Sequence, residues 1–312
     1  MQRRALSLIV IFAVTSLILT TAPAYSATIA GSACTKMGST KTISNKKYTC
    51  IKSGKKLIWD KGVTAKATPP VDAKAQAQLG ARMANIASVQ MLADRLYTNS
   101  QGLKVDNPTA KTMKGATVAA QQAAAKTARQ MIMGFSPMFP NFDLNDLPKE
   151  SLNYSDPNMA PAHGVFHLTQ TFFANTAGGV DEKLVPSWYS EGSAAMFATM
   201  VAAKMAKNNP NYAMLAAKNT WDWTKEKCAA QFEKWRASDA ADETTNNACA
   251  AGLGQIMVEA LVNKVDALDK VLLVYQMLAI GNSFDDALKY AFGTNKADFF
   301  AEMDALLANL KW

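Results

Sequence analysis

Apolar residues recur every three or four positions over most of the chain, which is the spacing of one face of a helix. Between positions 75 and 97 the residues that follow this spacing are Leu79, Met83, Ile86, Val89, Leu92 and Leu96. The same pattern, with abundant alanine and methionine, predicts further helices over 116–133, 160–175, 186–207, 212–237, 248–263, 267–280, 283–293 and 295–310. We therefore predict a mainly α-helical domain over 75–312. The pattern does not decide whether this domain also contains a small sheet.

One irregular stretch, 134–143, interrupts the helical pattern with two prolines and three phenylalanines. It either packs its aromatic side chains near the start of the helix predicted over 160–175 or forms a strand beside that helix.

The residues before this domain follow a different pattern. Between 33 and 60, short runs of β-forming residues alternate with turn formers at Gly38, Ser44-Asn45 and Ser53-Gly54. This predicts a small β module over 28–62. The following residues, 63–74, include Ala-Thr-Pro-Pro-Val and predict a linker.

The first 27 residues have the composition of a secretory signal peptide. A basic start, Met1–Arg4, precedes the apolar run Ala5–Leu19 and a segment of small residues that ends at Ala27. An uncleaved membrane anchor is the alternative, because the apolar run is close to the shortest length that spans a bilayer. The small residues favour cleavage, so we expect a secreted protein, extracellular or in the cell envelope.

The four cysteines are Cys34, Cys50, Cys228 and Cys249. An even number in an exported chain indicates two disulfides, and pairing of sequence neighbours is the simplest of the three connectivities. The Cys34–Cys50 pair would staple the β module, which is too small to be stable on its own core. A cysteine zinc site is disfavoured because the chain has no C-x-x-C sequence.

Positive charge is concentrated near the N-terminus. The whole chain has a net charge of +8, yet residues 28–66 carry nine lysines against the single acid Asp60. Residues 67–312 carry 22 basic and 24 acidic side chains, which argues against a nucleic-acid-binding protein. The lysine-rich module is either a tether to anionic cell-wall polymer or lipid head groups, or a solvated surface without a dedicated partner.

Both histidines of the chain, His163 and His167, lie four residues apart. On a helix this spacing places two imidazoles on one face, about one turn apart, where both can bind one metal ion. Glu191 follows 24 residues after His167 and is a candidate third ligand. Two hydrogen-bonded core histidines are the alternative interpretation.

The stretches Pro161–Gln170 and Val185–Gly192 resemble the gluzincin-type zinc metallopeptidases. In that family a helical H-E-x-x-H is followed by a second helix with a Trp-x-x-Glu-Gly-like motif. The resemblance covers about residues 155–310, and the N-terminal segment resembles the lysine-rich modules that follow the signal peptide in many secreted bacterial proteins. The gluzincin resemblance implies a zincin-like helical body that binds Zn²⁺ through His163, His167 and Glu191.

The chain departs from this family at one position, because Gly164 stands where the family has its catalytic glutamate. That glutamate acts as the general base, and such help is typically worth about 10²–10⁴-fold in rate. A glycine there indicates either relaxed selection on the base or a close approach of another segment. We expect a catalytically impaired peptidase homologue that binds a peptide or protein ligand.

Two other functions stay open at this point. One is an active zinc peptidase that uses another base, such as Asp181 or Glu182 in the loop before Glu191. The other is a non-enzymatic cell-surface binding protein that holds no metal.

Overall fold

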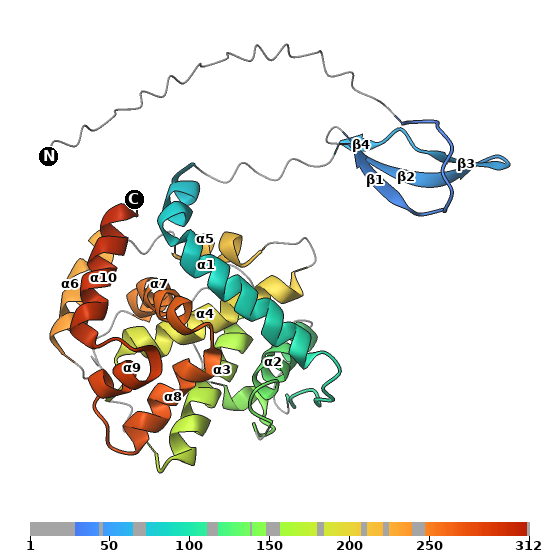
Figure 1. The fold of residues 1–312 in the computed structure, drawn as a ribbon. Helices are drawn as coiled ribbons and strands as arrows, with labels where there is room; N and C mark the ends of the chain where they lie inside the picture. Colours follow the sequence, from blue (N-terminus) through green and yellow to red (C-terminus); the bar gives the residue numbers. More distant parts are fainter. Residues whose placement is uncertain are drawn as a thin grey trace, which may run out of the picture. The chain divides into compact units, whose positions relative to one another are not determined.

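The structure is a computed structural model that describes residues 29–43, 46–64, 73–110, 118–137, 139–147, 157–179, 184–206, 211–220, 225–238 and 247–310 (Figure 1). The chain divides into two compact units, Met1–Pro70 and Val71–Trp312. The predicted signal peptide over 1–27 and most of the predicted linker over 63–74 lie outside the described residues. Among the described residues, no helix has the length and hydropathy needed to cross a membrane.

The N-terminal unit contains a small antiparallel sheet with β2 (Lys46–Ser53) at its centre. β2 pairs with β1 (Thr40–Ile43), β3 (Lys56–Trp59) and β4 (Val63–Thr64). The two-residue turn between β2 and β3 begins at Gly54, whose φ of 60° is the left-handed conformation that such turns favour. The predicted short strands are confirmed, and β4 continues the sheet into the predicted linker.

A disulfide and a few buried side chains hold this sheet together. Cys50 of β2 is bonded to Cys34, as the local pairing predicted. Cys50 and Tyr48 are the buried hydrophobic residues of the module. Because their core is so small, the covalent link contributes a large share of the module's stability.

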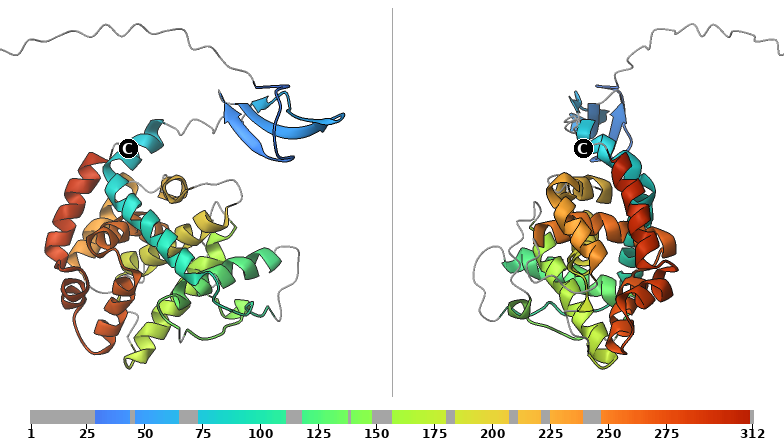
Figure 2. Two further views of the ribbon diagram at one scale, coloured as in Figure 1. Left: turned by 45° about the vertical axis from the view of Figure 1, so that its right-hand side comes forward. Right: turned by 90° about the vertical axis from the view of Figure 1, so that its left-hand side faces the viewer.

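The C-terminal unit is helical, and the predicted fold class is confirmed. Its helices are α1 (Ala73–Ser100), α2 (Val118–Met133), the short 3₁₀ helix η1 (Leu144–Asp146), α3 (Met159–Thr176), α4 (Ser187–Met205), α5 (Tyr212–Thr220), α6 (Lys225–Ala237), α7 (Asn247–Val265), α8 (Leu268–Ala279), α9 (Phe284–Phe292) and α10 (Lys296–Asn309). Figures 1 and 2 show α1 running along the outside of the helical body.

The sequence predicted one helix over 212–237, whereas the structure has two, α5 and α6, on either side of the undescribed residues 221–224. The two helices pack against different partners: α5 against α1, α4 and α7, and α6 against α7 and α10. A disulfide between Cys228 and Cys249 joins the first turn of α6 to the first turn of α7, so the second predicted pairing is also confirmed. The apolar spacing could not reveal the change of partner.

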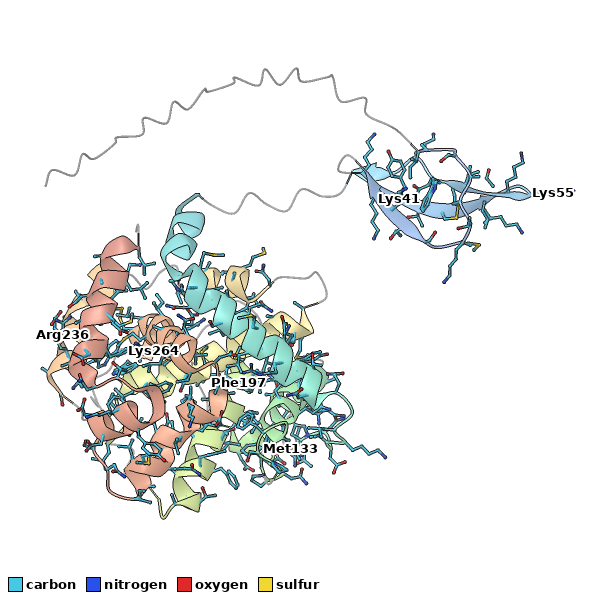
Figure 3. The ribbon with its side chains drawn as sticks, in the orientation of Figure 1. Lys41, Lys55, Met133, Phe197, Arg236 and Lys264 are labelled. Carbon is cyan, nitrogen blue, oxygen red and sulfur yellow. A yellow bond between two sulfur atoms is a disulfide. The ribbon has the colours of Figure 1, made fainter. Side chains whose placement is uncertain are left out.

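Helix α4 is the centre of this unit, because every residue from Gly192 to Ala202 is buried. It packs against α3 and α7, and α8 packs against α3. Phe197 of α4 lies in the interior of the body (Figure 3), with its ring centroid 4.9 Å from that of Phe166 on α3. The two helices that carry the predicted metal ligands are therefore held together by a packed core.

A second contact fixes α4 against α7. A Cβ atom added to Gly192 would lie 2.2 Å from the backbone carbon of Gly254, and one added to Gly254 would lie 2.4 Å from the carbonyl oxygen of Trp188. These distances leave no room for a side chain at either position. The small residues of both helices thus allow backbone-to-backbone contact directly beside Glu191.

A buried polar network connects α1, α5 and α7. Arg82 of α1 pairs with Glu259 of α7, and its Nη1 donates to Thr220 of α5 at 2.8 Å. The hydroxyl of Tyr212 donates to Glu259 at 2.7 Å, and the amide of Gln255 donates to Glu259 at 3.0 Å. Each buried charge therefore has several partners, which a buried ion pair requires.

The irregular stretch after α2 packs its aromatic side chains on α3, but near the C-terminal end of that helix and not, as the first alternative predicted, near its start. Phe139 is buried, and its ring centroid lies 5.7 Å from that of Phe172 on α3. The strand-like pairing in the described part of the helical unit is a single parallel bridge between Thr109 and Asp143.

Candidate metal centre

Helix α3 places His163 and His167 one turn apart, as their spacing predicted. Their ring centroids are 4.6 Å apart, and their Nε2 atoms face each other at 2.8 Å. His163 is fully buried, whereas the side chain of His167 is 14% exposed. The histidine pair therefore lies at the edge of the core, with one ring inside it.

Glu191 joins the two histidines from the second turn of α4. Its Oε2 lies 3.2 Å from Nε2 of His163, and its Oε1 lies 3.6 Å from Nε2 of His167. The three side chains can present one ligand atom each within 4.8 Å of one another. The structure thus brings together all three ligands that were predicted from the sequence, and this group could hold a metal ion.

The separations of these donor atoms fit a metal ion bound at ordinary distances. In a tetrahedral site with metal–ligand bonds of about 2.0–2.1 Å, two donor atoms lie roughly 3.3 Å apart. The two imidazole nitrogens are 2.8 Å apart, and the carboxylate lies 3.2 Å from His163 through Oε2 and 3.6 Å from His167 through Oε1, so the distances fall on both sides of that value. The exposed edge of the group is formed by His167 and Glu191.

Gln170, three residues after His167, fixes the tautomer of that histidine. The amide nitrogen of Gln170 donates to the carbonyl oxygen of Ser190 at 3.0 Å and contacts Oγ of Ser193 at 2.9 Å. Because that carbonyl can only accept, Oε1 of Gln170 must point the other way, and it lies 2.7 Å from Nδ1 of His167. Nδ1 therefore carries the hydrogen, and Nε2 of His167 presents its lone pair to the candidate site.

This tautomer has a consequence for His163. Nε2 of His167 and the carboxylate of Glu191 are both acceptors, and both lie next to Nε2 of His163. Two acceptors can lie this close to Nε2 of His163 only if that nitrogen carries a hydrogen or a positive charge lies among the three groups. In the metal-free protein the Nε2 hydrogen of His163 fills that role, and a bound metal ion would take its place.

The protonation states of the group suit metal binding at neutral pH. Burial lowers the pKa of His163 to about 4, although the hydrogen bond with Glu191 acts in the opposite direction. Burial alone would raise the pKa of Glu191, but its hydrogen bonds with His163 and His167 lower that pKa to about 2. The imidazole of His163 is thus neutral and the carboxylate ionised, which are the forms that bind metals.

Another segment packs closely against the position of the missing base. A Cβ atom added to Gly164 would lie 3.2 Å from Cβ of Leu147 and 3.5 Å from its Cδ2. Leu147 directly follows η1, which begins with a capping box between Asp143 and Asp146. Of the two explanations for this glycine, the structure supports close approach of another segment.

Two groups near the site were not foreseen from the sequence as functional residues. Gln170 has no motif of its own, and only its position one helical turn after His167 hinted at contact. Tyr275 of α8 has a buried hydroxyl beside Ser190 and Ser193 but makes no hydrogen bond of normal geometry. Burial raises the pKa of Tyr275 above its usual value, so its phenol stays protonated.

The candidate bases Asp181 and Glu182 lie outside the described residues.

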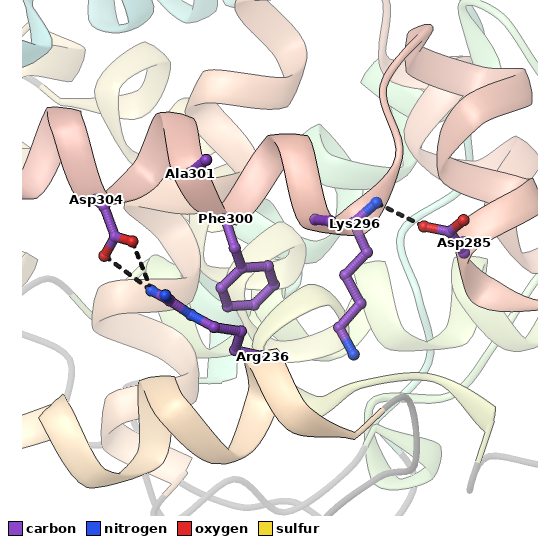
Figure 4. A pocket seen from close by; sticks show the side chains of 7 residues that line it. Arg236, Asp285, Lys296, Phe300, Ala301 and Asp304 are labelled. Atoms are coloured by element: carbon purple, nitrogen blue, oxygen red, sulfur yellow. Dashed lines mark hydrogen bonds and ion pairs between the residues drawn. The ribbon is translucent and has the colours of Figure 1, made fainter.

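A separate pocket of about 410 Å³ lies where α6, α9 and α10 meet (Figure 4). The guanidinium of Arg236 bonds both carboxylate oxygens of Asp304 at 2.8 Å, and Asp285 accepts from the backbone nitrogen of Lys296 at 2.6 Å. None of the predicted site residues lines this pocket. Its acids are engaged with groups of the pocket itself, so it offers no site for the predicted chemistry.

Comparison with known proteins gives no family for this chain. No family of known proteins matches it, and no match was found among curated proteins or solved structures.

Proposed function

We propose that His163, His167 and Glu191 bind a divalent metal ion, and that the protein is a gluzincin-like homologue with impaired catalysis. The observation that carries the proposal is the convergence of two imidazole nitrogens and a carboxylate from α3 and α4. Two nitrogens and one carboxylate oxygen are the ligand set of many catalytic zinc sites, so Zn²⁺ is the ion that fits best.

The surrounding residues prepare the three ligands for metal. Gln170 holds the tautomer of His167, and Ser190 and Ser193 in turn hold Gln170. The packing of Gly192 against Gly254 fixes the part of α4 that carries Glu191. When bound, Zn²⁺ would supply a Lewis acid that lowers the pKa of a water molecule and polarises a carbonyl group.

Catalysis is impaired in this proposal because neither residue 164 nor Tyr275 can act as the general base. Gly164 has no side chain, and Leu147 occupies the adjoining space. Tyr275 does not replace the base, since its raised pKa keeps the phenol protonated. The loss of a general base typically lowers the rate by about 10²–10⁴-fold, so the retained role is binding of a peptide or protein ligand.

The compartment follows from several features together. The two disulfides indicate an oxidising environment. With the signal-peptide composition of residues 1–27, they support secretion to the exterior or the cell envelope.

The test is a proteolysis assay on a general substrate such as casein, with zinc supplied, with and without a chelator. Wild type is expected to bind zinc and to show no chelator-sensitive cleavage. Glu191→Gln is expected to lose zinc, whereas Glu302→Gln, a half-exposed acid of α10 away from the ligands, is expected to keep it. Chelator-sensitive cleavage by wild type would show an active peptidase with another base, and absence of zinc from wild type would refute the metal site.

A further inference from the structure

The β module presents an unusual density of positive charge. All eight lysines described between residues 29 and 64 are exposed, namely Lys36, Lys41, Lys46, Lys47, Lys52, Lys55, Lys56 and Lys61. Asp60 is the one acid in this range. Its Oδ1 accepts from the backbone nitrogens of Thr49 at 3.0 Å and Gly62 at 2.9 Å, so this carboxylate serves the fold of the module. The lysines therefore face solvent without acidic neighbours from their own module.

The strand register distributes these lysines over both faces of the sheet. Along β2, Lys46, Tyr48, Cys50 and Lys52 follow one another at intervals of two residues, so their side chains share a face. Lys41 of β1 is the cross-strand partner of Tyr48 and lies on the same face. Lys47 lies on the other face of β2, together with Ser53, whose cross-strand partner is Lys56 of β3. The remaining lysines lie in loops and turns, including Lys55 at the tip of the β2–β3 hairpin (Figure 3).

The distribution of lysines over both faces distinguishes a flat membrane from a flexible charged polymer as the partner of the module. A flat bilayer can contact only one face of a small sheet and would leave the lysines of the other face unused. A flexible charged chain can follow both faces and neutralise lysines on each. The large hydrophobic residues exposed in the module are Met37 and Ile51, and two such side chains make too small an apolar surface for a membrane-binding patch.

The aromatic residues favour a polymer that is recognised by its charge alone. Binding of single-stranded nucleic acid relies on exposed aromatic rings on which bases stack. Tyr48 is 3% exposed, and Trp59, on the same face, is only partly exposed. The module thus offers ammonium groups on a disulfide-linked scaffold and no stacking platform.

We propose that the β module binds a flexible polyanion of the phosphate-polymer class through lysines on both faces of its sheet. The lysines hold the polymer as point charges, so affinity depends on the number of charges neutralised and not on a shaped pocket. This proposal is independent of the metal centre in the helical unit. It assigns the module the task of holding the protein on an anionic polymer.

The test measures binding of the full-length protein to long-chain inorganic polyphosphate over a range of salt concentrations. One variant removes the charges of one face (Lys41→Gln, Lys46→Gln and Lys52→Gln), and a second removes those of the other (Lys47→Gln and Lys56→Gln). The control variant changes three exposed lysines of the helical unit (Lys104→Gln, Lys218→Gln and Lys289→Gln). Orthophosphate and vesicles of phosphatidylcholine with phosphatidylglycerol are the comparison ligands.

Wild type is expected to bind polyphosphate more tightly than orthophosphate or vesicles, with a logarithmic salt slope on the order of 0.7 per neutralised charge. The first variant should reduce that slope by about 2 and the second by about 1.4, while the control leaves it unchanged. Absence of polyphosphate binding, or equal binding by both module variants and wild type, would overturn the proposal. Preference for vesicles, with an effect from one face only, would assign the module to a membrane surface.

Discussion

Leu147 packs against the backbone of Gly164, at the position directly after the first histidine of the candidate metal centre. A Cβ atom at residue 164 would lie 3.2 Å from Cβ of Leu147, closer than such atoms normally approach. The glycine therefore permits the segment that follows η1 to pack on α3. The glycine that permits this contact also leaves position 164 without a side chain that could act as base.

The first prediction concerns restoring that base. Gly164→Glu alone is expected to remain inactive, because the new side chain must displace Leu147. Combined with Leu147→Ala, it should give zinc-dependent proteolysis, with a gain in rate on the order of 10²-fold or more over Leu147→Ala alone. The measurement is chelator-sensitive cleavage of casein. A double variant that binds one zinc per chain and yet cleaves nothing would show that more than the base is missing.

The second prediction concerns Gln170. Gln170→Leu removes the acceptor for the Nδ1 hydrogen of His167 and is expected to weaken zinc binding by about 10–100-fold, as loss of such supporting hydrogen bonds typically does. Gln170→Glu keeps an acceptor at that atom but loses the hydrogen bond that the amide nitrogen donates to Ser190, so it should retain more affinity than Gln170→Leu and less than wild type. Competition with a zinc indicator measures both variants. Equal zinc affinities for the two variants would mean that the hydrogen bond between residue 170 and Nδ1 of His167 does not orient this imidazole for metal binding.

The third prediction concerns the contact of α4 with α7. Gly192→Ala places a methyl group 2.2 Å from the backbone of Gly254, so the helices must separate. The free energy of unfolding is expected to fall by about 1–3 kcal/mol or more. Gly164→Ala is the matched control, since its new methyl group lies 3.2 Å from Cβ of Leu147, a distance that a shift of a few tenths of an ångström relieves. Urea unfolding compares the two, and a greater loss in the control would contradict the assignment.

The fourth prediction concerns the pH dependence of the metal-free protein. The pKa of His163 is about 4 in the folded state, against roughly 6.5 in an unfolded chain. Between these values the unfolded state binds a proton that the folded state does not bind. The free energy of unfolding therefore decreases as pH falls from about 6.5 to about 4, by about 3 kcal/mol from this group.

Thermal melting of chelator-treated protein across this pH range is the measurement. His163→Gln cannot take up that proton and should show a shallower dependence than wild type. Parallel curves for the two proteins would contradict the burial of a neutral His163.

The sequence predicted the helices well because the apolar residues that they bury recur at helical spacing, even in α4, where every residue from Gly192 to Ala202 is buried. It also predicted that His163 and His167 face each other, because they share one helix and their separation depends on helix geometry alone. The approach of Leu147 to Gly164 and of Gly192 to Gly254 could not be predicted. Both contacts join segments that are distant in the sequence, and a glycine alone does not identify its neighbour.

The same limit applies to polar partners. Arg82 and Glu259 are 177 positions apart, and nothing in their local sequence indicates a shared buried network. The division of the predicted helix over 212–237 into α5 and α6 depended on which helices each part contacts. Local sequence patterns predict where helices and strands lie, whereas the buried ion pair and the partners of α5 and α6 depend on tertiary packing.

The most direct test of the central claim is the metal content of the purified protein after dialysis, measured by elemental analysis for wild type and His167→Ala. The account predicts about one zinc ion per wild-type chain and none in the variant, with both proteins retaining their helical circular dichroism. Wild-type protein that is folded but holds no zinc, even after incubation with excess zinc, would contradict it.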